Sequence, residues 1–138
     1  MKETVYVSYC EPTTSSMTRP SNQEMLDRMT QFGIRVCRVA DKLPNAPSSW
    51  VVAKQVIRSA TSVGANYQEA QRSRSNKEFI SKLHVCLQEA EETRHWLRTI
   101  EGAGNTKSSE VGLLIRESSE LIAVLVASIN TMQRRSRP

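Results

Sequence analysis

The stretch RSATSVGANYQEAQRSRSNKEF, residues 58–79, decides how this chain folds. It has few large apolar side chains, yet its apolar residues recur at alternating steps of three and four, which keeps one face of a helix apolar. The stripe starts upstream and consists of Ala53, Val56, Ala60, Val63, Tyr67 and Ala70. We therefore predict mostly helix, with a break between Arg74 and Ser75, where Ser75-Asn76-Lys77-Glu78 has the pattern of a capping box.

The segment after this break is predicted to be a helix of about 27 residues, roughly 40 Å long. Gly102 and Gly104 end it, as glycines do after a helix C-terminus. Its apolar seam consists of Phe79, Leu83, Cys86, Ala90, Thr93, Leu97 and Ile100.

Two further helices flank this pair. The first is predicted to start with a capping box from Ser21 to Glu24 and to stop at Pro44 and Pro47, after which Ser48 or Ser49 caps the second helix. The stripe of the first helix is Leu26, Met29, Gly33, Val36, Ala40 and Leu43. The last helix starts near residues 105–109, and its seam is Val111, Leu114, Ser118, Leu121, Leu125, Ser128 and Met132, widened by Ile115, Ile122 and Ile129.

Four amphipathic helices with short connections predict an all-α fold, an antiparallel up-down four-helix bundle over residues 21–133. Residues 1–20 are predicted to be a flexible N-terminal arm, with a short strand at residues 5–9 as the alternative. Residues 134–138 are predicted to be a basic C-terminal tail. The length of 138 residues fits one domain.

The composition indicates which partners and which cellular compartment the protein is expected to have. Nineteen Lys and Arg against 14 Asp and Glu give a net charge of +5, which favours an anionic partner, although basic solubility alone also accounts for it. The three cysteines are far apart and imply no disulfide framework, so a reducing cytoplasm is expected. No apolar run approaches the roughly 18 residues of a membrane span, and no signal-peptide core is present, so no membrane association is expected.

A second, polar stripe lies about 100° around the second helix from the apolar one. Its members are Gln55, Ser59, Ser62, Asn66, Glu69 and Ser73. It is either an ordinary solvated face or a close polar seam against a neighbouring helix. For the seam we predict the residues Arg58, Ser59, Ser62, Asn66, Glu69 and Glu92. A buried Glu69 would need a partner, with Arg58 and Arg94 as candidates.

Two segments carry a resemblance to a known family. QVIRSATSVGANYQEA (residues 55–70) and RSNKEFISKLHVCLQEAEETRHWL (residues 74–97) resemble the four-helix-bundle proteins encoded in intervening sequences of bacterial 23S ribosomal RNA genes. The matching positions are Arg58, Ser59, Ala60, Ser62, Val63, Ala65, Asn66, Glu69, Ala70, Ser75, Lys77, Phe79, Ile80, Leu83, Glu89, Glu92, Thr93, Trp96 and Leu97. The first helix lacks the family's W-Q-K-A element and has LDRMTQFGIRVCRVADKLP (residues 26–44) instead.

The resemblance implies a compact bundle that forms a ring-like homopentamer. It also implies similarity to the accessory proteins of diversity-generating retroelements, which bind nucleic acid and a reverse transcriptase. Nucleic-acid association is therefore the leading expectation, with a reverse transcriptase or another protein as a further partner and no known catalysis.

The residues themselves predict neither an enzyme nor a metal site, and no cofactor is expected. Glu92 and His95 form an E-x-x-H, the spacing of di-iron bundles, but a full site needs a second such motif. The other histidine, His84, has Ser81 where its glutamate would be, and lies about 16 Å along the helix from His95. No nucleophile elbow or glycine-rich phosphate loop is present.

The basic residues form two clusters that an up-down bundle would bring to the same end. Together they are Arg72, Arg74, Lys77, Lys82, Arg134, Arg135 and Arg137. We predict that they bind nucleic acid, with a merely solvated surface as the alternative. The second function class is a structural or adaptor homo-oligomer whose partner is a protein. Self-association would use apolar residues that one bundle does not bury, predicted as Trp50, Val52, Ile80, Val85, Trp96, Val124 and Val126.

Overall fold

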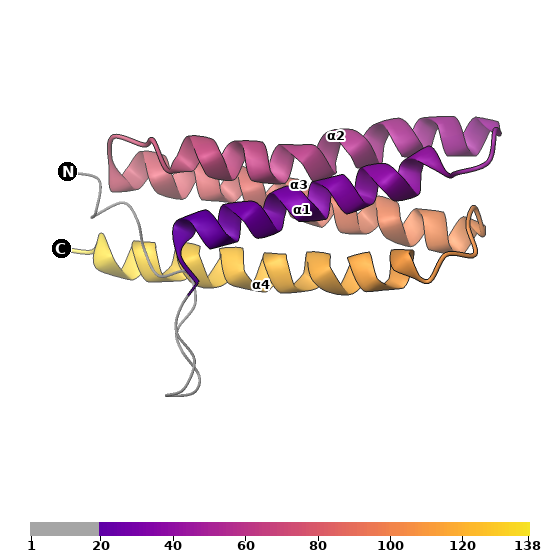
Figure 1. Ribbon diagram of the computed structural model, residues 1–138. Coiled ribbons are helices and arrows are strands. Elements are labelled where there is room, and N and C mark those ends of the chain that lie inside the picture. The colour runs from indigo at the N-terminus through magenta and orange to yellow at the C-terminus, as the bar shows by residue number, and fades with distance from the viewer. Residues whose placement is uncertain (1–19) are drawn as a thin grey trace.

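A computed structural model describes residues 20–138, which form four helices in an up-and-down arrangement (Figure 1). They are α1 (Asn22–Asp41), α2 (Pro47–Ala70), α3 (Asn76–Ala103) and α4 (Glu110–Arg135). Each helix packs against the next in sequence, and α1 also contacts α4, less extensively. The predicted all-α, antiparallel four-helix bundle is confirmed. The predicted arm lies outside the described residues, apart from Pro20.

The helix starts follow from their caps. Ser21 forms the complete capping box of α1, with its Oγ 3.0 Å from the Glu24 nitrogen and its own nitrogen 2.6 Å from Glu24 Oε1. At α3 only half of the predicted box forms. Ser75 Oγ accepts from the Glu78 nitrogen at 3.1 Å, but the Glu78 carboxylate accepts from the Arg74 nitrogen instead.

The predicted start of α2 is wrong by about one half-turn. Ala46 is the N-cap and Pro47 is the first helical residue, a position where the missing proline N–H costs nothing. Ser48 and Ser49 therefore lie inside the first turn, where their hydroxyls accept from Asn105 Nδ2 at 3.3 and 2.8 Å. These bonds tie the α3–α4 connection to the start of α2.

The core confirms the predicted seams of α3 and α4, whose members are all buried. The α1 stripe is displaced by one residue at its start, because Met25 is buried while Leu26 is only partly covered. It is also wider than predicted, since Phe32 and Val39 are buried, and Leu43 at its end is only partly covered. Both the predicted and the observed stripe have helical spacing, and Met29, Val36 and Ala40 belong to both. Gly104, with φ of 69°, ends α3 as predicted, whereas Gly102 lies within the helix.

Several apolar side chains are exposed to solvent on the surface of the bundle. Trp50 is 59% exposed and Val126 is 40% exposed, in line with expectation. Val52 was expected at the surface and is buried, because it lies on the core face of α2. Over residues 20–138, no helix combines the length and apolar character that a bilayer span requires.

Candidate functional site

Two segments about 60 residues apart meet at one end of the bundle, as the topology predicts: the α2–α3 turn and the end of α4 (Figure 1). Lys77 and Ser136 line the same surface hollow, of about 440 Å³. We call this end, with its six exposed basic side chains, the basic end; its residues are Arg72, Arg74, Lys77, Arg134, Arg135 and Arg137.

Within residues 20–138, no carboxylate neutralises the charges of the basic end. In the part of the chain that the structure describes, none of the six residues takes part in an ion pair. Arg134 Nη2 makes one long hydrogen bond, 3.5 Å, to Thr131 Oγ1. The neighbouring Glu78 accepts the Arg74 backbone N–H and caps α3. Six cations are therefore free to contact phosphate groups.

The α2–α3 turn presents its arginines because the residue between them is anchored. The backbone nitrogen of Ser73 donates to the Ala70 carbonyl at 3.1 Å, and the Ser73 side chain is 1% exposed. Arg72 and Arg74 on either side lie exposed. At α4, Arg134 and Arg135 form the last helical turn rather than a separate tail, where cations interact favourably with the helix dipole.

Lys82, the seventh predicted basic residue, differs from the six. Its Nζ lies 2.8 Å from Glu69 Oε1, and this hydrogen bond raises the pKa of Lys82. Lys82 is therefore the partner of Glu69, and the predicted partners Arg58 and Arg94 were wrong. Arg58 instead pairs with Glu89 and Glu92, and Arg94 donates to Ser119 Oγ at 3.1 Å.

The predicted polar stripe on α2 contacts α3 at some positions only. Thr93 Oγ1 donates to Ser59 Oγ at 2.9 Å, and both side chains are fully buried. Ser62 and Asn66 do not bond to α3, because each side chain donates to a carbonyl oxygen of its own helix, at 2.7 and 2.8 Å. Glu69 of α2 forms its ion pair with Lys82 of α3, yet the Glu69 side chain is 60% exposed. It therefore lies at the solvent-exposed edge of the α2–α3 contact and not in a buried seam.

Glu92 of the E-x-x-H is held by hydrogen bonds from protein side chains. It accepts from Arg58, and from Trp96 Nε1 at 3.1 Å, and the Arg58 hydrogen bond lowers the pKa of Glu92. His95 lies exposed with its ring edge-on to Trp96, the centroids 4.9 Å apart. Within residues 20–138, no three potential metal ligands of the His, Cys, Asp or Glu types lie together.

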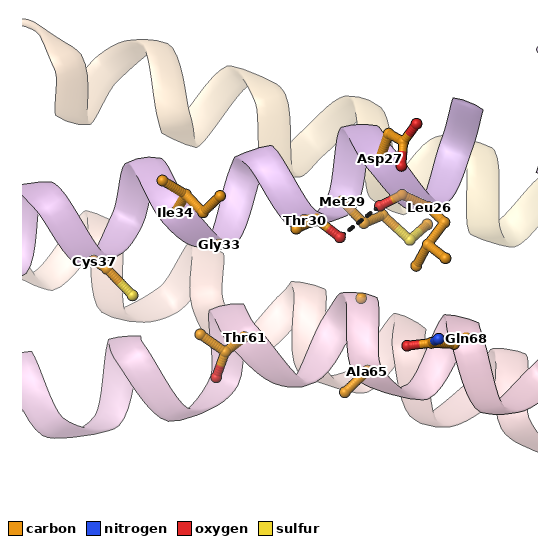
Figure 2. Close-up of a pocket in the computed structure, with 11 residues that line it drawn as sticks. Leu26, Asp27, Met29, Thr30, Gly33, Ile34, Cys37, Thr61, Ala65 and Gln68 are labelled. Carbon is orange, nitrogen blue, oxygen red and sulfur yellow. Dashed lines mark hydrogen bonds between the residues drawn. The ribbon is translucent and has the colours of Figure 1, made fainter. Parts of the chain in front are cut away.

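Sequence reasoning missed a groove of about 260 Å³ between α1 and α2 (Figure 2). Leu26, Met29 and Thr30 line it from α1, and Thr61, Ala65 and Gln68 line it from α2. Gly33 and Gly64 allow the two helices to approach closely there. Asp27 is the one charged residue among the lining residues that the structure describes. The pair of glycines on neighbouring helices was the signal available in the sequence.

Comparisons with known proteins agree with this architecture. The model of a family described as 23S rRNA-intervening sequence protein matches residues 21–127, which includes the α2–α3 turn but not Arg134, Arg135 or Arg137. A crystal structure of a protein of unknown function from the S23 ribosomal protein family of Bacteroides thetaiotaomicron VPI-5482 is 30% identical, with a TM-score of 0.72. The match covers 79% of this chain and 97% of that one. No curated protein matches the chain.

Proposed function

Because the chain belongs to the 23S rRNA-intervening sequence protein family, we propose that it is a non-enzymatic, oligomeric four-helix-bundle protein that binds nucleic acid through its basic end. The observation that supports this proposal is the gathering of six exposed, unpaired cations from two distant segments. In the cell it would act in the bacterial cytoplasm, in a ribonucleoprotein or as an accessory factor of a reverse transcriptase.

The proposed mode of binding is contact with phosphates and not the reading of bases. Base readout needs side chains inserted at base edges. The basic end consists of Arg and Lys side chains, so it offers no aromatic ring on which a base could stack. Binding should therefore tolerate many sequences. In a ring of subunits the basic ends would repeat around one rim, so that weak contacts reinforce one another.

The proposal is tested by measuring the affinity for a mixed-sequence single-stranded RNA and a mixed-sequence DNA duplex at several salt concentrations. Affinity should fall steeply with salt, with a log–log slope of about −0.7 to −0.9 per phosphate contacted. The triple variant Arg134→Gln, Arg135→Gln, Arg137→Gln should flatten this slope by about that amount for each phosphate that it no longer neutralises. Glutamine retains helix propensity, so circular dichroism should be unchanged.

A matched control removes three exposed cations away from the basic end: Lys54→Gln, Arg98→Gln and Arg116→Gln. This control has the same net charge as the triple variant and should keep the wild-type slope. If neither nucleic acid binds at low salt, or if both triple variants lose affinity equally, the basic end is only a solvated surface.

The second candidate is a structural or adaptor homo-oligomer whose partner is another protein. The observation that favours it is the exposure of large apolar side chains, with Trp50 at 59%, Val51 at 61% and Leu113 at 45%. Co-purification of a single protein that survives nuclease treatment, together with indifference to added nucleic acid, would favour this candidate over the first.

A further inference from the structure

A second basic hollow lies at the opposite end of the bundle from the basic end. It has a volume of about 290 Å³ and lies between the last turns of α1 and the α3–α4 connection. Its polar lining consists of Arg35, Arg38, Lys42, Thr106, Ser108 and Glu110. We infer that this hollow, which we call the anion pocket, binds a compact phosphate group, either free or at the end of a larger molecule.

Two cations of the pocket come from one face of α1, and the third, Lys42, is the C-cap residue that follows the helix. Residues 35, 38 and 42 are spaced by three and four, which places their side chains along one side of the helix. Arg38 and Lys42 are exposed, and among residues 20–138 neither forms an ion pair. Only Arg35 is partnered, with its Nε 2.8 Å from Glu110 Oε2. Two uncompensated positive charges therefore remain for an anion.

The opposite wall of the pocket offers hydroxyl donors. Thr106 Oγ1 accepts from the Ser108 nitrogen at 3.1 Å, and Ser108 Oγ accepts from the Glu110 nitrogen at 3.1 Å. A hydroxyl both donates and accepts, and neither O–H has an acceptor in the described part of the chain. Both protons are therefore available to the oxygens of an anion, facing the guanidinium and ammonium groups of α1.

Glu110 is the one negatively charged residue among the lining residues of the anion pocket that the structure describes. Its carboxylate repels an anion, and Arg35, through the hydrogen bond, lowers the pKa of Glu110 so that the carboxylate stays charged near neutral pH. Three cations against one carboxylate still leave an excess of positive charge. Removing the carboxylate should therefore strengthen anion binding, because it also releases Arg35 towards the ligand.

The inference goes beyond the proposed function, because it concerns other residues, the other end of the molecule and a compact ligand. The test uses calorimetric titration of the full chain with inorganic pyrophosphate and inorganic phosphate at an ionic strength of about 0.1 M. Arg38→Gln with Lys42→Gln should weaken pyrophosphate binding at least about tenfold, because the charge-assisted hydrogen bonds to the anion are removed. Glu110→Gln should bind more tightly than the wild type.

Two controls separate the pocket from the overall charge of the protein. Lys54→Gln with Arg98→Gln removes the same charge outside the pocket, and the triple arginine variant of the basic end removes charge at the far end. Both should bind pyrophosphate within about twofold of the wild type, since screening confines such effects to about 10 Å at ordinary ionic strength. An oligonucleotide with and without a 5′-phosphate distinguishes a terminal phosphate from a free one.

The inference is overturned if pyrophosphate does not bind to the wild type, or if the pocket variant and the two controls lose affinity equally. It is also overturned if Glu110→Gln, folded by circular dichroism, binds less tightly than the wild type. None of these outcomes bears on nucleic-acid binding at the basic end, which is read from the salt slope of a different set of variants.

Discussion

Gly33 and Gly64 lie on facing helices, but the space around each is different. A Cβ on Gly33 would lie 3.3 Å from the carbonyl oxygen of Ala60, a rigid backbone atom. A Cβ on Gly64 would lie 3.5 Å from Thr30 Oγ1, an ordinary van der Waals distance. We expect Gly64→Ala to raise the free energy of unfolding by about 0.5–1 kcal/mol, because alanine favours the helix. Gly33→Ala should gain less or destabilise, as urea unfolding would measure.

Both variants replace a helical glycine with alanine, so they differ chiefly in the space that the new methyl group enters. Equal stabilisation by the two changes would mean that α1 and α2 separate easily at Gly33, and that the close approach there is not needed for packing.

Single side-chain partners were the hardest feature to predict from the sequence. Glu69 has Arg58 eleven residues before it and Lys82 thirteen after it. Arg58 is on the same helix, about 16 Å away along its axis, so helical spacing already excludes it. Which residue of α3 meets Glu69, Lys82 or Arg94, depends on how α2 and α3 are rotated against each other, and spacing within one helix does not contain that angle. The same holds for Met25 and Leu26 of α1, which compete for one core position until the neighbouring helices are placed.

At the scale of helices, ion pairs help hold α1 against α4. Arg28 binds Glu117 and Glu120, each at 2.7 Å, and Arg35 binds Glu110. The pKa of Glu110 is lowered by Arg35, so the pair contributes stability above the unfolded glutamate pKa and loses it as pH falls through the folded pKa. Glu110→Gln should therefore cost up to about 1 kcal/mol at pH 7, a value discounted for solvent screening.

The measurement is urea unfolding of the wild type and Glu110→Gln at neutral pH and again at a pH well below the ordinary glutamate pKa of about 4.3, because the pKa of folded Glu110 is lowered. The difference between them should shrink in acid. Glu101→Gln is the control, because Glu101 makes no ion pair in residues 20–138 and its effect should be the same at both pH values. A difference that persists undiminished in acid would show that Glu110 acts through packing and not through its charge.

Whole helices, in contrast, followed well from local chemistry. The seams of α3 and α4 were predicted residue by residue, because each has one continuous apolar face at helical spacing. The start of α2 was misplaced because Pro47 ends one helix and suits the first position of the next equally well. The basic end could be predicted from topology alone. The anion pocket could not, since it depends on a loop lying beside α1.

At the scale of the whole molecule, we expect self-association, with five subunits by family resemblance. Trp50, Val51 and Leu113 are exposed apolar side chains that a subunit interface would cover. Light scattering at micromolar concentration should give a multiple of the monomer mass. Val51→Ser with Leu113→Ser should shift the protein towards smaller species, whereas Ala123→Ser, at an exposed small residue, should not. A wild-type monomer would contradict this expectation.

The order in which the helices pack has a consequence for how the chain reaches its fold. Helices that are neighbours in sequence pack against each other as helical hairpins. The ion pairs between α1 and α4, in contrast, join residues that are separated in sequence by 75, 89 and 92 positions. The entropy lost on closing a loop grows with its length, so the hairpins should form before the α1–α4 contact closes the bundle. Helical bundles, which are rich in contacts local in sequence, typically fold in microseconds to milliseconds. Because α1 and α4 are also less extensively packed than the other neighbouring helix pairs, we expect transient opening of the native bundle to begin at the α1–α4 edge.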